Sequence, residues 1–122
     1  MLFDPDYKKN LEIAKDEYGR FENADLVLLG MGKDGHTASI FPKDPLSAKA
    51  LSNSSPDLHN TSAPVHPEQR ITLNKKFICG AKEILLMISG DKKGLVFEKS
   101  RENNSPIGQF IQHINSVYYS IQ

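Results

Sequence analysis

An acid and an imidazole lie close together in a glycine-rich segment of this sequence. Asp34 and His36 flank Gly35, and Gly30 and Gly32 come shortly before them. The unperturbed pKa of histidine is about 6.5, so His36 is suited to act as a general base near neutral pH. Asp34 could orient the imidazole or stabilise its protonated form, and backbone N–H groups around Gly32 and Gly35 could stabilise a developing oxyanion. The segment therefore indicates general-base chemistry.

The elements around this segment place it at the end of a sheet strand. Residues 26–29 (Leu-Val-Leu-Leu) are apolar at consecutive positions and stop at Gly30, which predicts a strand buried on both faces. Residues 84–88 show the same pattern, and residues 117–121 predict a last strand. Open α/β sheets bind ligands at the carboxyl ends of parallel strands, so we expect Asp34 and His36 at that edge.

Helices are expected before and between these strands. Asp4 and Pro5 predict the start of a helix that ends at Gly19. Its apolar face comprises Tyr7, Leu11, Ala14 and Tyr18. Further on, Asn74 and Asp91 are expected to cap helices that run to about Cys79, before Gly80, and to about Arg101.

The remaining segments complete a single α/β domain over residues 1–122. Residues 37–41 and 106–111 predict short helical segments, and residues 70–73 a short extended one. Residues 43–67 hold several Pro, Ser and Asn and are expected to form a long loop. The alternation of strands and helices predicts a parallel sheet flanked by helices.

Composition narrows the classes of function. The chain has 122 residues and a formal net charge of zero, which argues against a nucleic-acid or anionic-membrane surface. The single cysteine, Cys79, allows no internal disulfide, so a cytoplasmic location is expected. The Cys79 side chain is expected to be packed among its apolar neighbours. No Cys/His cluster indicates a metal, and no cofactor is expected. His59, His66 and His113 match no motif and are expected to be exposed loop residues.

Four segments, taken together, resemble the 6-phosphogluconolactonase family. Residues 28–42 (LLGMGKDGHTASIFP) carry the most specific part of the resemblance. Residues 70–73, 88–93 and 105–107 follow in the order that the family has. The resemblance covers nearly all of the chain and implies a Rossmann-like parallel sheet of the sugar-phosphate isomerase/lactonase type.

The resemblance implies hydrolysis of 6-phosphogluconolactone in the pentose phosphate pathway. His36 would be the base, assisted by Asp34, with Gly32 and Gly35 near the substrate. Arg70 would offer a planar fork to the phosphate and Lys93 a point charge. The related glucosamine-6-phosphate deaminases have a catalytic Glu seven residues after the Asp, where this chain has Phe41, so a lactonase is favoured.

The sequence also departs from the family. Family members are much longer, and the Ser-Gly-Gly phosphate loop of their first half is not found here. We therefore expect a partial fold that lacks the N-terminal half, and either self-association or a partner chain that covers the open sheet edge. Two functions stay open: a lactonase that is weak or inactive as this chain alone, and a non-catalytic remnant that binds sugar phosphates or proteins.

Overall fold

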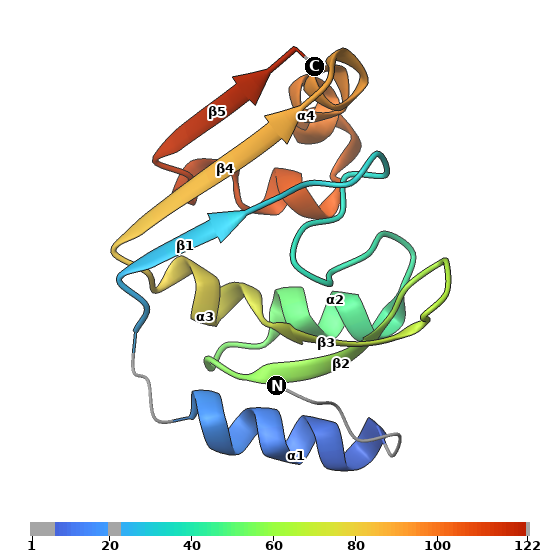
Figure 1. Cartoon of the computed structure of the whole chain (residues 1–122), viewed down its shortest axis with the longest axis vertical. Coiled ribbons are helices and arrows are strands. Elements are labelled where there is room, and N and C mark those ends of the chain that lie inside the picture. The colour runs from blue at the N-terminus through green and yellow to red at the C-terminus, as the bar shows by residue number, and fades with distance from the viewer. Residues whose placement is uncertain (1–6, 20–22, 122) are drawn as a thin grey trace.

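The chain folds into a small parallel sheet and a separate β-hairpin, and the first helix lies on the side of the hairpin away from the sheet (Figure 1). The structure is a computed structural model that describes residues 7–19 and 23–121. Its helices are α1 (Tyr7–Tyr18), α2 (Pro45–Ser52), α3 (Lys75–Cys79) and α4 (Asp91–Asn103), with 3-10 turns η1 (Pro106–Gln109) and η2 (Ile111–His113). Its strands are β1 (Leu26–Leu29), β2 (Leu58–Ser62), β3 (Gln69–Leu73), β4 (Glu83–Ser89) and β5 (Ser116–Ser120).

The main sheet has the order β1-β4-β5, and both pairs of strands are parallel. Leu29 pairs with Leu86, and Leu86 pairs with Val117, so the strands run in register toward one edge. The carboxyl ends of β1 and β4 therefore meet at the same edge, as the sequence predicts. The expected α/β fold with a parallel sheet flanked by helices is confirmed.

The expectation that the strands are buried on both faces is wrong. Ile84, Leu86 and Ile88 of β4 are buried, but Leu26 and Leu28 of β1 are 55% and 60% exposed. The buried side chains pack against Ile78 of α3, and against Ile107 and Phe110 in and next to η1, in one core. Within the described residues, helices cover only this core face, which is why a run of consecutive apolar residues does not imply burial of both faces here.

Local capping signals are correct for the helix after β3. The Asn74 side chain accepts a hydrogen bond from the Phe77 N–H at 2.9 Å, and Gly80 follows the last turn of α3. α1 also ends before Gly19, as expected, but the predicted start at Asp4 and Pro5, and the side chain of Tyr7, lie outside the described residues.

The cap of α4 differs from the expectation. Gly90, with φ of 95°, holds the N-cap position, and Asp91 is the first residue of the helix. The Asp91 carboxylate instead accepts a hydrogen bond from the Tyr119 hydroxyl at 2.9 Å, which joins α4 to β5. The helix runs slightly past Arg101, and Asn104 ends it in the left-handed conformation, with φ of 55°.

Residues 43–67 are not the long loop that their composition predicts. Asp44 caps α2 by accepting hydrogen bonds from the backbone N–H groups of Leu46 and Ser47, and Pro45 is the first helical residue. Strand β2 follows and pairs antiparallel with β3. Residues 37–41 also differ, because Thr37 and Ile40 form an isolated β-bridge rather than a helical turn.

Further sequence expectations concern the burial of Cys79 and the exposure of two histidines. Cys79 is half-buried beside the core, and burial raises the pKa of its thiol, opposed by the charges of Lys75 and Lys76. His66 and His113 are exposed, as expected. Among the helices of residues 7–19 and 23–121, none combines the length and the apolar character needed to cross a bilayer.

Candidate functional site

The glycine-rich segment forms a closed turn at the carboxyl end of β1. The Gly32 N–H donates to the His36 carbonyl at 2.9 Å, and the Gly35 N–H donates to the Gly32 carbonyl at 3.0 Å. The Thr37 hydroxyl then donates to the Gly30 carbonyl at 2.7 Å, which ties the end of the turn to its start. These bonds hold the Asp34 and His36 side chains on a fixed backbone.

Asp34 and His36 are in direct contact. The His36 Nδ1 lies 2.5 Å from an Asp34 carboxylate oxygen, and the same oxygen accepts the His36 backbone N–H at 3.0 Å. Burial raises the pKa of the Asp34 carboxyl, but these hydrogen bonds and the nearby imidazole outweigh that effect and lower it. An ionised Asp34 keeps the proton of neutral His36 on Nδ1, and Nε2 is then the basic nitrogen.

Gly32 and Gly35 are required by the packing of the turn. A Cβ at Gly32 would overlap the His36 imidazole, and Gly35 has φ of 83°, which favours glycine. A Cβ at Gly35 would also lie 2.7 Å from the Ser105 Cβ. The N–H groups of Gly32 and Gly35 themselves already donate to carbonyls inside the turn, and the oxyanion role of backbone N–H groups around them stays a prediction.

Two ring contacts of Phe41 link Arg70 to His36. The rings of His36 and Phe41 have centroids 4.8 Å apart, and the Arg70 guanidinium carbon lies 5.6 Å from the Phe41 ring centroid. The Arg70 Nε donates to the Pro67 carbonyl at 2.7 Å, so this bond leaves the two terminal nitrogens uninvolved. Phe41 is only 4% exposed and connects the expected base to the expected phosphate ligand.

Three hydroxyl-bearing residues that the sequence reasoning did not single out attach the turn to the β2–β3 hairpin. The Ser39 N–H donates to the Thr72 hydroxyl at 3.2 Å, and the Thr61 hydroxyl donates to the Ser39 carbonyl at 2.6 Å. Thr61 and Thr72 are buried, at 2% and 4% exposed. The sequence pattern of a strand does not reveal such hydrogen bonds, because the bonded residues are distant in sequence.

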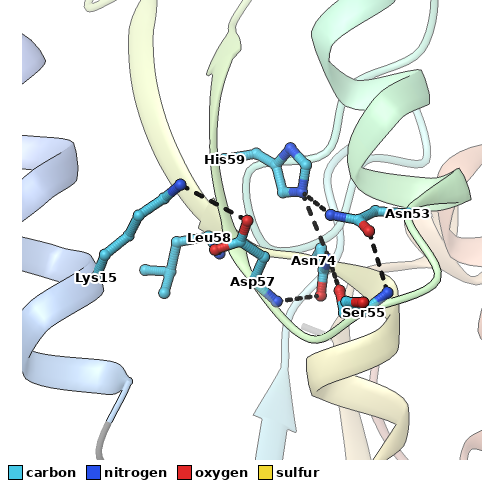
Figure 2. Close-up of polar contacts among 7 residues, drawn as sticks. All are labelled: Lys15, Asn53, Ser55, Asp57, Leu58, His59 and Asn74. Carbon is cyan, nitrogen blue, oxygen red and sulfur yellow. Dashed lines mark hydrogen bonds and ion pairs between the residues drawn. The ribbon is translucent and has the colours of Figure 1, made fainter.

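His59, in β2, belongs to a partly buried polar network with residues at the ends of α2 and α3 rather than to an exposed loop (Figure 2). The Asn53 Nδ2 lies 3.1 Å from the His59 Nε2, and the Asn74 Nδ2 lies 3.5 Å from it. Both amides have their oxygen occupied by backbone N–H groups, so their NH₂ groups face His59, and Nε2 must accept. The expectation that His59 is an exposed loop residue is therefore wrong.

Lys93 is the expected site residue that the structure does not join to the others. It lies half-buried in the first turn of α4, which follows the carboxyl end of β4. Within the described part of the chain, no hydrogen bond, ion pair or ring contact links it to Asp34, His36 or Arg70. Its place at the same edge of the sheet as the turn is set by the parallel pairing of β1 and β4.

A cavity of about 660 Å³ opens beside the turn. It is lined by Asp34, by residues 41–45, by Ala48 and Leu51 of α2, and by residues 103–106 with Gln109. Ser105 lines the cavity too, and its buried hydroxyl makes no hydrogen bond within the described residues. The described residues contain no cluster of three or more His, Cys, Asp or Glu side chains that could hold a metal ion.

The chain matches a known family over most of its length. Residues 4–118 match the family of glucosamine-6-phosphate isomerases/6-phosphogluconolactonase. A 6-phosphogluconolactonase of Neisseria meningitidis is 33% identical over 97 residues, which is 76% of this chain and 42% of that protein. The chain therefore spans less than half the length of this relative.

Solved structures give the same picture at the level of the fold. A putative 6-phosphogluconolactonase from Neisseria gonorrhoeae superposes with a TM-score of 0.77 at 29% identity, covering 98% of this chain and 56% of that one. A 6-phosphogluconolactonase from Shewanella baltica gives a TM-score of 0.82 at 27% identity, with 98% and 54% covered. Nearly all of this chain superposes on each of these structures, and each structure has a further portion that this chain does not match.

Proposed function

Because the chain belongs to the glucosamine-6-phosphate isomerase/6-phosphogluconolactonase family, we propose that its site serves hydrolysis of 6-phospho-D-glucono-1,5-lactone to 6-phosphogluconate. The observation that carries this proposal is the contact between Asp34 and the His36 Nδ1. It leaves Nε2 as a base beside a sheet edge, which is the group that attack by water on a lactone requires.

The chemistry needs one proton carrier. The His36 Nε2 takes a proton from water while the water oxygen bonds to the ring carbonyl carbon. When the bond between that carbon and the ring oxygen breaks, the imidazolium returns the proton to the leaving oxygen. Asp34 stabilises the imidazolium between these steps, since its carboxylate already accepts from Nδ1.

The phosphate of the substrate needs cations, and Arg70 is in the better position. Its guanidinium lies over the Phe41 ring, which also contacts His36, and its terminal nitrogens remain for a phosphate. Lys93 would add a second positive charge from α4. Binding of parts of the substrate away from the reacting bond supplies much of an enzyme's rate. Because only these two residues would bind the phosphate, we expect slow turnover by this chain alone.

A second candidate is binding of sugar phosphates without turnover. The chain covers only 42% of its Neisseria meningitidis relative, which favours a site that keeps the base but has an incomplete phosphate cradle. Glucosamine-6-phosphate deamination is a weaker third candidate. Phe41 occupies the position of the deaminase Glu, and its ring is packed between His36 and Arg70.

The test is the rate of 6-phosphogluconolactone hydrolysis above the spontaneous reaction, followed by proton release. We expect the purified chain to exceed the background, and His36→Ala to remove about 100- to 10,000-fold of the enzymatic rate. His113→Ala is the matched control, since His113 is exposed in η2. A rate equal to the background, together with measurable binding of 6-phosphogluconate, would replace the lactonase proposal with the binding one.

A further inference from the structure

The expected base and the expected phosphate ligand lie on two different parts of the fold. His36 belongs to the turn after β1, whereas Arg70 belongs to the β2–β3 hairpin, which is separate from the main sheet (Figure 1). The Arg70 Nε donates to the Pro67 carbonyl at 2.7 Å, so this bond fixes Arg70 to the hairpin and not to the turn. The spacing between His36 and Arg70 therefore depends on what joins the hairpin to the segment after the turn.

Ser39, three residues after His36, makes this connection with both of its backbone polar groups. Its N–H donates to the Thr72 hydroxyl at 3.2 Å, and its carbonyl accepts from the Thr61 hydroxyl at 2.6 Å. Thr61 is the cross-strand partner of Arg70, and Thr72 lies two residues beyond Arg70 in β3. Side chains related in this way point to the same face of a hairpin, so both threonines lie on the face that carries Arg70.

The backbone next to Ser39 shows that the segment after the turn needs such a hold. Ala38 has φ of 51°, in the left-handed region that residues with a Cβ rarely adopt. A residue persists in this conformation only where the surrounding structure holds it. On one side of Ala38 the Thr37 hydroxyl donates to the Gly30 carbonyl, and on the other side the two hairpin hydroxyls bind Ser39. Loss of a hairpin hydroxyl therefore lets this segment relax.

We propose that Thr61 and Thr72 are positioning residues, which set the distance between the His36 imidazole and the Arg70 guanidinium. They act through Ser39 rather than on the reacting bond. A ligand with a phosphate at one end and a carboxylate or lactone at the other spans Arg70 and the turn only while both hydroxyl contacts hold. The proposal rests on the sugar-phosphate site of the proposed function, and its test separates the two.

The test compares the affinities of two ligands by NMR titration, which also follows weak binding. Inorganic phosphate needs only Arg70, whereas 6-phosphogluconate spans Arg70 and the turn. Thr61→Val removes the hydroxyl and keeps the branched shape of the side chain. It should weaken binding of 6-phosphogluconate about tenfold and leave binding of inorganic phosphate unchanged. A loss of folded protein would affect both ligands alike, so the ratio of the two affinities separates positioning from stability.

Three further variants complete the comparison. Thr72→Val should change the ratio in the same direction, and Thr61→Ser should restore it because serine keeps the hydroxyl. Ser62→Ala is the matched control. Ser62 is the next residue of β2, is exposed, and bonds the Asp44 carboxylate through its backbone N–H, which this change keeps. Circular dichroism of each variant checks that its fold is retained.

Two results would overturn the proposal. The first is a Thr61→Val variant in which the two affinities change equally or not at all. The second is a wild type that binds neither ligand, which would also remove the sugar-phosphate site. Lactone hydrolysis distinguishes the two proposals. A rate equal to the spontaneous one, with the expected change of the ratio, rejects only the lactonase function. A rate above it, with an unchanged ratio, rejects only the role of the two threonines.

Discussion

Replacement of Asn74 by alanine is expected to be among the most destabilising single changes in the lower part of the molecule (Figure 2). Asn74 is fully buried, at 0% exposed, and caps α3. Its side-chain oxygen accepts the N–H groups of Phe77 at 2.9 Å and Asp57 at 3.2 Å. Its amide nitrogen donates to the Ser55 carbonyl at 2.8 Å. One side chain thus joins α3 to the segment that enters β2.

The size of the destabilisation depends on which hydrogen-bond partners of Asn74 are left buried without a replacement from water. Loss of an N-cap costs about 0.5–2 kcal/mol, and a buried group left without a partner costs about 1–3 kcal/mol. The Phe77 N–H is buried, whereas Ser55 is exposed and its carbonyl can turn to water. We therefore expect Asn74→Ala to lower the free energy of unfolding by about 3 kcal/mol, a large share of the roughly 5–15 kcal/mol typical of a domain.

Urea denaturation followed by circular dichroism measures this change. With a slope of about 2 kcal/mol per molar urea, the midpoint should fall by roughly 1.5 M. Asn74→Ser keeps an oxygen for the Phe77 N–H and should recover about half of the loss. Ser54→Ala is the control, because Ser54 is exposed in the same loop. If Asn74→Ala and Ser54→Ala had equal midpoints, the reasoning from buried hydrogen bonds would be refuted.

Three further predictions concern His59 and the turn. Burial and the charges of Lys15 and Lys49 lower the pKa of His59, and the charge of Asp57 opposes this effect. The contribution of neutral His59 to stability is therefore complete above about pH 6.5, the pKa of an unperturbed histidine, and is lost as the pH falls through the lowered pKa. Urea melts across this range should show that loss, and His59→Gln should abolish it; the carboxyls of Asp34 and Asp44, whose pKa values are also lowered, act only at more acidic pH. Gly32→Ala should force the imidazole away from Asp34, so nitrogen-15 NMR of His36 should lose the Nδ1–H form that is expected for the wild type; equal spectra for the two proteins would contradict the packing at Gly32. Phe41→Ala should cost about 3–5 kcal/mol in the same urea assay and Phe41→Leu clearly less, since the ring is 4% exposed, and equal costs would argue against a packing role.

The parts that the sequence predicted correctly depend on contacts over a few residues. The cap of α3 joins Asn74 to Phe77, and the parallel strands β1 and β4 each end at a glycine. The same kind of signal is present at Asp44 and Pro45, but the prediction of a loop over residues 43–67 rested on their content of Pro, Ser and Asn and did not use it. That segment became α2 and β2 because β2 pairs with β3, and composition does not report pairing.

The glycine turn that carries Asp34 and His36 was indicated by the sequence, whereas the direct contact between the two side chains was shown only by the structure, where the Ile107 N–H also donates to the Gly35 carbonyl at 2.9 Å. The rest of the site was decided by the tertiary structure. Arg70 reaches the turn only because the hairpin is bonded to Ser39 through Thr61 and Thr72. The exposure of Leu26 and Leu28 was also decided by the tertiary structure. The apolar run in β1 shows that the strand can be buried on both faces, but burial depends on which elements pack on each side of the sheet.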